Sequence, residues 1–277
     1  MPFSNSNFEN KLVVITGGTS GIGLALAREL YSRNARIILL ANKRAGVETA
    51  VQELGGRGER LEGYVCDVTI PESVAATGIA ILSKHGVPDV LVNNAGFATY
   101  RTFEQEQPDE VERLASVNFA GALRVTKAFL GGMIERRSGH VINIASIAGT
   151  LTLTPNAVYC GAKHGMMAWS RCLAIETARY GIHVGIVCPG RVETKFFDHE
   201  TFKARAHRKE TGLTIPMPAV VDAILDTIVR RRKVRFVPRY FGLLAWAANA
   251  FGPLVRGQLD RLMAARVEDL YKGKSTK

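Results

Sequence analysis

Cysteines are few in this sequence, and their spacing does not suit metal or disulfide chemistry. The chain has four of them, scattered and without any CxxC pair: Cys66, Cys160, Cys172 and Cys188. Disulfide frameworks and zinc sites need cysteines at close, paired spacings. We therefore expect reduced structural thiols and no metal site.

Long apolar runs are also lacking. The longest apolar stretch, residues 240–255, is interrupted by Gly242, Asn249, Gly252 and Pro253, and it is shorter than the roughly 20 residues that a membrane-spanning helix needs. The first eleven residues are polar and contain no basic run followed by an apolar one, so we expect no secretory signal there. These features predict a cytoplasmic protein without a transmembrane helix.

An excess of positive charge is absent from most of the chain. The formal net charge is +11 over 277 residues. Residues 203–277 hold 16 Lys and Arg against 6 Asp and Glu, whereas residues 1–202 hold 20 against 19. No helix-turn-helix, zinc-ligand or RNA-binding signature accompanies the basic quarter. We therefore expect no nucleic-acid partner.

Short, nearly continuous apolar runs alternate with longer helical patterns along the chain. They predict strands at Lys11–Thr16, Arg36–Ala41, Leu61–Asp67, Val90–Asn93, His140–Ala145 and His183–Val187, with a seventh at Val234–Val237. Strands of this kind are covered by helices on both faces. The fold class is α/β: one Rossmann-type domain over residues 1–277, with a core of about residues 10–238 built on a doubly wound parallel sheet of about seven strands.

A glycine-rich turn follows the first strand and opens the first helix, as Thr16-Gly17-Gly18-Thr19-Ser20-Gly21-Ile22-Gly23. Gly17 allows a tight turn, Gly21 lets a pyrophosphate approach the backbone, and Gly23 permits close packing of helix on strand. The start of the helix then offers free N–H groups to the phosphates. This predicts a dinucleotide site, although a merely flexible turn is the alternative.

The end of the second strand selects between NAD and NADP, because a carboxylate there would repel a 2′-phosphate. This chain has Asn42, Lys43 and Arg44 at that place, which favours NADP, with NAD possible. Lys43 and Arg44 can instead simply solvate the next helix. Asp67 closes the third predicted strand, where it can contact the adenine or serve as a turn residue.

Tyr159 and Lys163 lie one helical turn apart and therefore share a helix face. Reducing a carbonyl builds negative charge on its oxygen, which needs a hydrogen-bond donor and then a proton. A tyrosine supplies both, and a nearby ammonium lowers its pKa. Ser146 follows a strand at the edge where ligands bind in α/β sheets, so it can hold the substrate oxygen. Taken singly, each residue also has a purely structural explanation, and His164 points to another face and is interpreted as structural.

Five linked motifs resemble those of the short-chain dehydrogenases/reductases: the glycine turn, Asn93-Asn94-Ala95-Gly96, Ser146, Tyr159-x-x-x-Lys163 and Pro189-Gly190. The resemblance covers about residues 10–200. It implies oxidation or reduction of a carbonyl and alcohol pair, with Asn118 joining Ser146, Tyr159 and Lys163 in a catalytic tetrad through a proton relay.

The resemblance also implies a cofactor site. In it, Lys163 contacts the nicotinamide ribose and Thr194 the carboxamide. The implied contacts are Gly17, Thr19, Ser20, Gly21, Ile22, Gly23, Asn42, Lys43, Arg44, Asp67, Val68, Asn94, Ala95, Gly96, Tyr159, Lys163, Pro189, Gly190, Val192 and Thr194. A homodimer or homotetramer is implied as well, assembled through helices at about residues 109–136 and 158–180.

The last third of the chain leaves two alternatives open. A lid over the substrate is expected at about residues 191–218, where Phe196, Phe197 and Phe202 either line an apolar substrate pocket or pack the lid on the body. The extension at about residues 239–277 combines apolar and aromatic residues with basic flanks. It suits a peripheral membrane contact, or a helical flap over the substrate cleft or a neighbouring subunit.

Two functions from different classes remain at this point. The first is an NADP-preferring oxidoreductase that interconverts a carbonyl and an alcohol on an apolar small molecule. The second is a cofactor-binding sensor or scaffold of the same fold without turnover. The presence of Ser146, Tyr159 and Lys163 favours the enzyme.

Overall fold

The computed structural model describes residues 7–192, 194, 200–205 and 214–271. Seven strands form a single parallel sheet in the order β3-β2-β1-β4-β5-β6-β7. Their bounds are β1 Leu12–Thr16, β2 Arg36–Ala41, β3 Leu61–Val65, β4 Val90–Asn93, β5 Gly139–Ile144, β6 Ile182–Pro189 and β7 Val234–Val237. The predicted fold class and all seven strands are confirmed.

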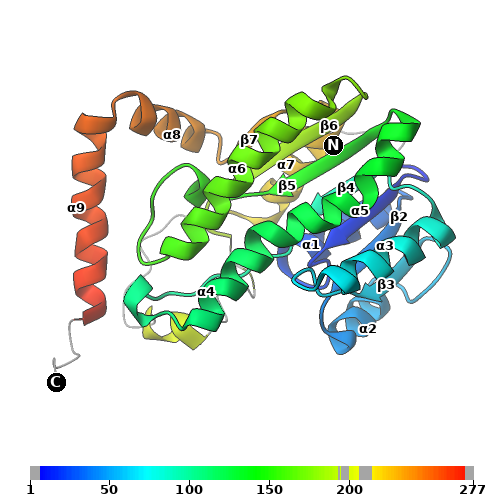
Figure 1. Ribbon diagram of the computed structural model, residues 1–277, viewed down its shortest axis with the longest axis horizontal. Helices are drawn as coiled ribbons and strands as arrows, with labels where there is room; N and C mark the ends of the chain where they lie inside the picture. The colour runs from blue at the N-terminus through cyan, green and yellow to red at the C-terminus, as the bar shows by residue number, and fades with distance from the viewer. Residues whose placement is uncertain (1–6, 193, 195–199, 206–213, 272–277) are drawn as a thin grey trace.

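Helices cover both faces of this sheet (Figure 1). One face carries α1 Gly21–Ser32, α2 Arg44–Glu53 and α7 Met217–Val229, and the other carries α3 Pro71–His85, α5 Gly121–Arg136 and α6 Ala157–Ala178. Alternate residues of β1 enter the two cores, Val13 the first and Val14 the second. This two-sided burial explains why the central strands are nearly continuously apolar.

The order of the strands changes direction at β1. From β1 the chain adds β2 and β3 on one side, and then β4 to β7 on the other side. The chain leaves β1 into α1 on one face, and it leaves β4 towards α5 on the opposite face. Ligands of open α/β sheets bind in the crevice at such a point, beyond the carboxyl ends of the strands. The fold therefore places the candidate site at the exits of β1, β4 and β5.

A long helical segment precedes β5, and one turn within it is π-helical instead of α-helical. It consists of α4 Pro108–Ala115, a π-helical turn at Ser116–Ala120, and α5. Single π turns inside helices occur frequently at functional sites. Here the turn contains Asn118, whose side chain is fully buried.

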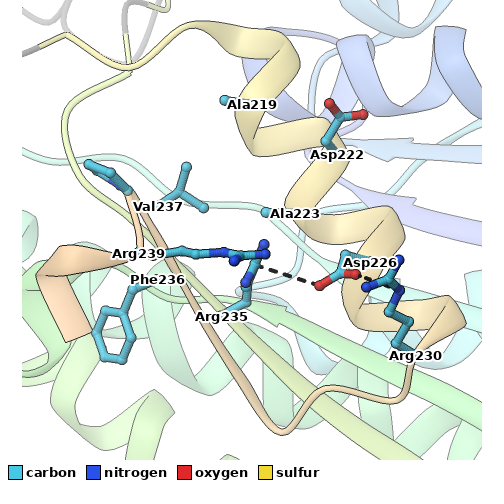
Figure 2. A pocket seen from close by; sticks show the side chains of 10 residues that line it. Ala219, Asp222, Ala223, Asp226, Arg230, Arg235, Phe236, Val237 and Arg239 are labelled. Carbon is cyan, nitrogen blue, oxygen red and sulfur yellow. Dashed lines mark ion pairs between the residues drawn. The ribbon is translucent and has the colours of Figure 1, made fainter. Parts of the chain in front are cut away.

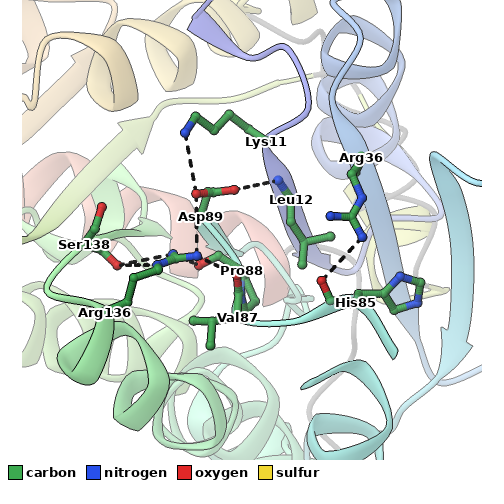
Figure 3. A network of polar contacts seen from close by, with 9 residues as sticks. All are labelled: Lys11, Leu12, Arg36, His85, Val87, Pro88, Asp89, Arg136 and Ser138. Atoms are coloured by element: carbon green, nitrogen blue, oxygen red, sulfur yellow. Dashed lines mark hydrogen bonds and ion pairs between the residues drawn. The ribbon is translucent and has the colours of Figure 1, made fainter. Parts of the chain in front are cut away.

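A polar network lies at the amino-terminal ends of the strands, opposite the strand exits (Figure 3). Asp89, just before β4, accepts a 2.9 Å hydrogen bond from the backbone N–H of Leu12, and Lys11 and Arg136 both approach its carboxylate to 3.7 Å. Arg136 also donates to the backbone oxygens of Val87 and Pro88. The network ties the starts of β1 and β4 to the end of α5, far from the strand exits.

The last helices, α8 Tyr240–Ala250 and α9 Gly252–Tyr271, extend away from the sheet beyond β7 (Figure 1). α9 returns to the rim of the strand exits at two places. The backbone oxygen of Met263 accepts a hydrogen bond from Thr154 (3.2 Å), and the hydroxyl of Tyr271 bonds to Thr102 (2.9 Å) and Glu104. Among the described residues, none of the helices combines the length and apolar character needed to cross a membrane.

Candidate active site

The glycine turn has the conformation that its sequence predicts. Gly17 and Gly21 have φ angles of +62° and +52°, in the left-handed region that favours glycine. A Cβ on Gly23 would stand only 2.4 Å from the backbone oxygen of Gly17, so this position has no room for a side chain. Helix α1 starts after Ser20 with no side-chain cap and no acidic residue in its first turn. The turn therefore presents backbone N–H groups in an arrangement that suits an anion.

Residues that follow β4 stabilise this turn by hydrogen bonds. The Thr16 hydroxyl accepts hydrogen bonds from the backbone N–H groups of Asn94 (2.9 Å) and Ala95 (3.0 Å). The amide of Asn94 in turn donates to the oxygens of Thr16 and Gly17, at 3.1 Å each. Asn94 and Ala95 thus lie at the glycine turn, as predicted. The bracing role of Thr16 was not predicted, although a hydroxyl at the end of an otherwise apolar strand was the available signal.

The segment after β6 forms the wall that faces the glycine turn. Gly190 is held by a 2.9 Å bond to the oxygen of Val237 at the end of β7, and Val192 pairs with Ile215. Thr194 lies against the turn, since a Cβ on Gly21 would be 3.3 Å from its Cβ atom. Pro189, Gly190, Val192 and Thr194, all predicted cofactor contacts, therefore belong to one segment that reaches the glycine turn at Thr194. Phe196 and Phe197 of the expected lid lie outside the described residues.

The exit of β2 carries Asn42, Lys43 and Arg44, all exposed. The helix that follows begins beside the glycine turn, because a Cβ on Gly46 would be 3.6 Å from the Thr19 hydroxyl. Ile22 points the other way and packs on the core. The two basic side chains are therefore close to the turn and open to solvent.

Asp67 and Val68 follow β3, which ends at Val65, earlier than predicted. The reason is a turn in which Oδ1 of Asp67 accepts from the N–H (2.9 Å) and the hydroxyl (2.7 Å) of Thr69. Of the two roles left open for Asp67, the structure shows the turn. Val68 is buried against Gly121.

Ser146 and Tyr159 meet at the exit of β5. Ser146 lies two residues beyond the strand and Tyr159 lies in the first turn of α6. Burial raises the pKa of the Tyr159 hydroxyl, and a hydrogen bond with Ser146 opposes this rise. Oγ of Ser146 also accepts from the N–H of Ala148 (3.2 Å), so the residue is a strand-end cap as well.

Lys163 is buried one turn along α6. Its Nζ donates to the backbone oxygen of Ile144 (3.0 Å) and lies 5.6 Å from the centre of the Tyr159 ring. Burial lowers the pKa of Lys163 to about 8. The expected lowering of the Tyr159 pKa by this ammonium is not found: burial raises the pKa, and the hydrogen bond with Ser146 is what opposes the rise.

Asn118 reaches the same place from the π turn. Its amide donates to the oxygens of Phe97 (2.8 Å) and Leu114 (3.0 Å). A Cβ on Gly96 would be 2.7 Å from Oδ1 of Asn118 and 3.6 Å from Nζ of Lys163. All four predicted tetrad residues therefore gather at the exits of β4 and β5, and Gly96 makes room between two of them.

Two further predictions concern neighbouring residues. Nδ1 of His164 lies 2.9 Å from the backbone oxygen of Cys160, one turn earlier in α6, in keeping with a structural role. Phe202 packs on Tyr100, with ring centres 5.6 Å apart. This contact supports packing of the expected lid on the body rather than the lining of a pocket, at least for Phe202.

The sequence matches the short chain dehydrogenase family over residues 11–204. The chain belongs to this family. As a short-chain dehydrogenase, it is a nicotinamide-dependent oxidoreductase that acts on a carbonyl or alcohol group of a small molecule.

Among its relatives, a 3-oxoacyl-(acyl-carrier-protein) reductase FabG of Vibrio cholerae is 33% identical over 77% of this chain and 84% of that protein. Dehydrogenase/reductase SDR family member 7B of Mus musculus is 28% identical over 99% of this chain and 86% of that protein. A solved structure of an actinorhodin polyketide ketoreductase variant with NADPH has a TM-score of 0.73 and 31% identity, and covers 87% of this chain and 99% of that one.

The residues of this short-chain dehydrogenase fit a nicotinamide dinucleotide. A Cβ at Gly17 or Gly23 would meet the backbone of Ala95 at 3.0 Å or of Gly17 at 2.4 Å, so only glycine at these positions gives the turn its tight cradle shape, at the start of α1. Thr194 closes the cradle from the far side. Among the described residues there is no group of three or more His, Cys, Asp and Glu side chains that could hold a metal ion.

Proposed function

We propose that this short-chain dehydrogenase works as an NADP-dependent reductase of a carbonyl group on an apolar small molecule. The observation that carries the proposal is the hydrogen bond between Tyr159 and Ser146 at the exit of β5, with Lys163 buried one turn away. The bound nicotinamide supplies the hydride. The residues of this chain bind the substrate oxygen and deliver the proton.

In the proposed reaction, Tyr159 is the general acid. Its raised pKa keeps the hydroxyl protonated near neutral pH, which is the form that reduction requires. Ser146 holds the carbonyl oxygen beside that hydroxyl and stabilises the developing negative charge. Lys163 binds the nicotinamide ribose. Lys163 and Asn118, facing each other across Gly96, return a proton to the tyrosine after each turnover.

The proposed preference for NADP rests on the exit of β2. Asn42 stands where a carboxylate would exclude a 2′-phosphate, and the exposed Lys43 and Arg44 offer it positive charge. The solved ketoreductase that resembles this chain was determined with NADPH. The remaining cofactor contacts are proposed as predicted, with Asp67 and Val68 beside the adenine and Thr194 on the carboxamide.

An apolar substrate is supported by what surrounds the strand exits. α9 is attached to both sides of the opening, at Thr154 and at Thr102, and so covers it with a helix whose Met263 is buried. The FabG relative is named for a 3-oxoacyl substrate and the solved neighbour for a polyketide. We infer a ketone on an acyl-like chain as the substrate class.

The rest of the proposal concerns the whole molecule. We propose that residues 1–277 act as a single domain, and that copies assemble into a homodimer or homotetramer through α5 and α6. We place the protein in the cytoplasm, with a peripheral membrane contact through the extension at residues 239–277.

The test is NADPH oxidation with a panel of acyl, steroid, aromatic and small polyol carbonyls, repeated with NADH. Tyr159→Phe should lower kcat by about a thousandfold, because only the acid is lost, while the Kd for NADPH stays within a factor of about two. Tyr180→Phe, just beyond the far end of the same helix, is the matched control and should keep full activity. Undiminished turnover in Tyr159→Phe would sink the assignment.

A further inference from the structure

A cavity lies at the β7 edge of the sheet, between α7 and β7 (Figure 2). Its volume is about 310 Å³. It is lined by small apolar side chains such as Ala219, Ala223 and Val237, together with an arginine rim made up of Arg230, Arg235 and Arg239. The proposed reaction uses none of these residues.

The rim carries more positive charge than the protein neutralises. The carboxylate of Asp226, almost fully buried, lies 3.2 Å from Nε of Arg230, 3.5 Å from Nε of Arg232 and 3.6 Å from Nε of Arg235. Arg239 lines the same cavity, and Figure 2 shows it extending alongside Arg235 towards α7. Three guanidinium groups, those of Arg230, Arg235 and Arg239, therefore line the cavity against the two carboxylates of Asp222 and Asp226.

The neighbouring arginines affect the pKa of Arg235. Burial, followed by the neighbouring charge of Arg239, lowers the pKa of its guanidinium, with Arg232 and Arg230 adding to the effect. An arginine in a protein does not give up its proton. An anion in the cavity would relieve this repulsion instead, so the rim has the chemistry of a phosphate site.

The cavity continues directly into an exposed apolar surface on α8. Arg239 has helical backbone angles (φ −58°, ψ −36°), so that Leu243, four residues on, shares its helix face. Leu243 is 70% exposed and Trp246 63% exposed, and Tyr240, Leu244 and Phe251 are exposed as well. Large apolar and aromatic side chains beside arginines match the boundary of a bilayer, where acyl chains meet headgroups.

We propose that the arginine cavity binds the phosphate of an anionic phospholipid while the exposed face of α8 enters the outer acyl region of the same bilayer. This rests on the peripheral membrane contact of the proposed function and names the lipid chemistry that recognises it. Exposed Arg231 and Lys233, on the loop before β7, add to the attraction. A second copy of this chain fits less well, because a twofold contact would set these cations against themselves.

The experiment is co-sedimentation of the full-length protein with vesicles of phosphatidylcholine alone or with 30% phosphatidylserine (about one lipid in three, enough to mimic an anionic leaflet). We expect binding to the anionic vesicles, weakened by salt, and little binding to the neutral ones. Inorganic phosphate at millimolar concentration is the third arm. It should compete only weakly, because it gains nothing from α8.

Two double variants separate the parts of the surface. Arg235→Gln with Arg239→Gln should weaken binding to anionic vesicles about tenfold or more, and so should Leu243→Ser with Trp246→Ser. The matched controls are Arg57→Gln and Ile79→Ser, an exposed arginine and an exposed isoleucine elsewhere, and both should bind like the wild type. Turnover of a water-soluble ketone should be unchanged in all of them, so the failure of this proposal is distinguishable from failure of the proposed reaction.

Four results would overturn the proposal. The first is equal binding to neutral and anionic vesicles. The second is binding that the arginine variant keeps in full. The third is tight binding of inorganic phosphate with no binding to vesicles, which would assign the cavity to a free phosphate compound. A fall in oligomeric mass in the Leu243 and Trp246 variant, measured by light scattering, would show a subunit contact on α8 and would equally count against a lipid surface.

Discussion

Asn118 turns its side-chain oxygen towards Gly96, and only the missing side chain of that glycine leaves room for it. A Cβ there would be 2.7 Å from Oδ1, which is fully buried and accepts no hydrogen bond within the described part of the chain. A buried polar atom without a partner costs free energy. Its retention beside Lys163 supports the relay role proposed for Asn118.

We expect Asn118→Ala to lower kcat about tenfold or more, because the relay is interrupted. It should also lower the free energy of unfolding by about 1–3 kcal/mol, since the oxygens of Phe97 and Leu114 lose their donor. Chemical denaturation and steady-state kinetics measure the two effects. Asn143→Ala is the matched control, a buried asparagine within β5 that donates to Ser170. It should lose similar stability with kcat nearly intact, and equal losses of kcat in both variants would contradict a specific role for Asn118.

The buried Lys163 predicts a pH dependence of cofactor binding. Because burial lowers its pKa to about 8, the side chain is charged below that pH and becomes neutral above it. A neutral amine binds the ribose less well. The Kd for NADPH, followed by nicotinamide fluorescence from pH 6 to 10, should therefore rise as the pH passes about 8.

Lys163→Met provides the check on this dependence. It should bind NADPH about tenfold more weakly at pH 7, and its Kd should change little between pH 7 and 9. If Lys163→Met shows the wild-type rise in Kd near pH 8, a different group titrates.

The sheet could be predicted from the sequence because most strand residues are apolar in nearly continuous runs, which few other structures require. The hydrogen bonds between buried polar side chains could not be predicted from the sequence. The amide of Asn93 donates to Oδ1 of Asn143 (2.8 Å) and to the hydroxyl of Thr126, and the amide of Asn143 donates to the hydroxyl of Ser170. These contacts join residues from four separate elements, so no local sequence pattern predicts them.

The site was predictable for a related reason. Its residues lie at strand exits and in one helical turn, where local spacing fixes their positions. The π turn that directs Asn118 and the attachment of α9 through Tyr271 to Thr102 have no such local signal. The second contact joins residues 169 positions apart. Contacts of that kind depend on the packing of the whole chain.

The exit of β2 predicts which cofactor is preferred. Replacing Lys43 and Arg44 together with serine should raise the KM for NADPH about tenfold to a hundredfold and leave the KM for NADH nearly unchanged, because only the 2′-phosphate loses its partners. Asn42→Asp should have the same direction of effect by repulsion. Arg57→Gln is the control for the loss of a surface arginine. A parallel change in both KM values would contradict the assignment.

His140 and His183, on neighbouring strands, predict how stability depends on pH. Their rings are 5.5 Å apart, and burial lowers the pKa of each to about 4 from an ordinary value near 6.5. Between these values the unfolded chain binds protons that the folded chain does not, so acidification favours unfolding. The stabilising effect of keeping both rings neutral is thus fully present above about pH 6.5 and is lost progressively as the pH falls towards 4.

Urea denaturation at a series of pH values measures this directly. The wild type should lose stability between pH 6.5 and 4 with a slope that reflects uptake of about two protons from this pair. His140→Phe removes one titrating ring of similar size, whose buried Nδ1 accepts no hydrogen bond among the described residues. In this variant, the proton uptake on unfolding that the slope reports should fall by about one proton, while the free energy of unfolding at pH 7 changes little. A His140→Phe protein that acid destabilises as steeply as the wild type would show that the buried pair does not control the response.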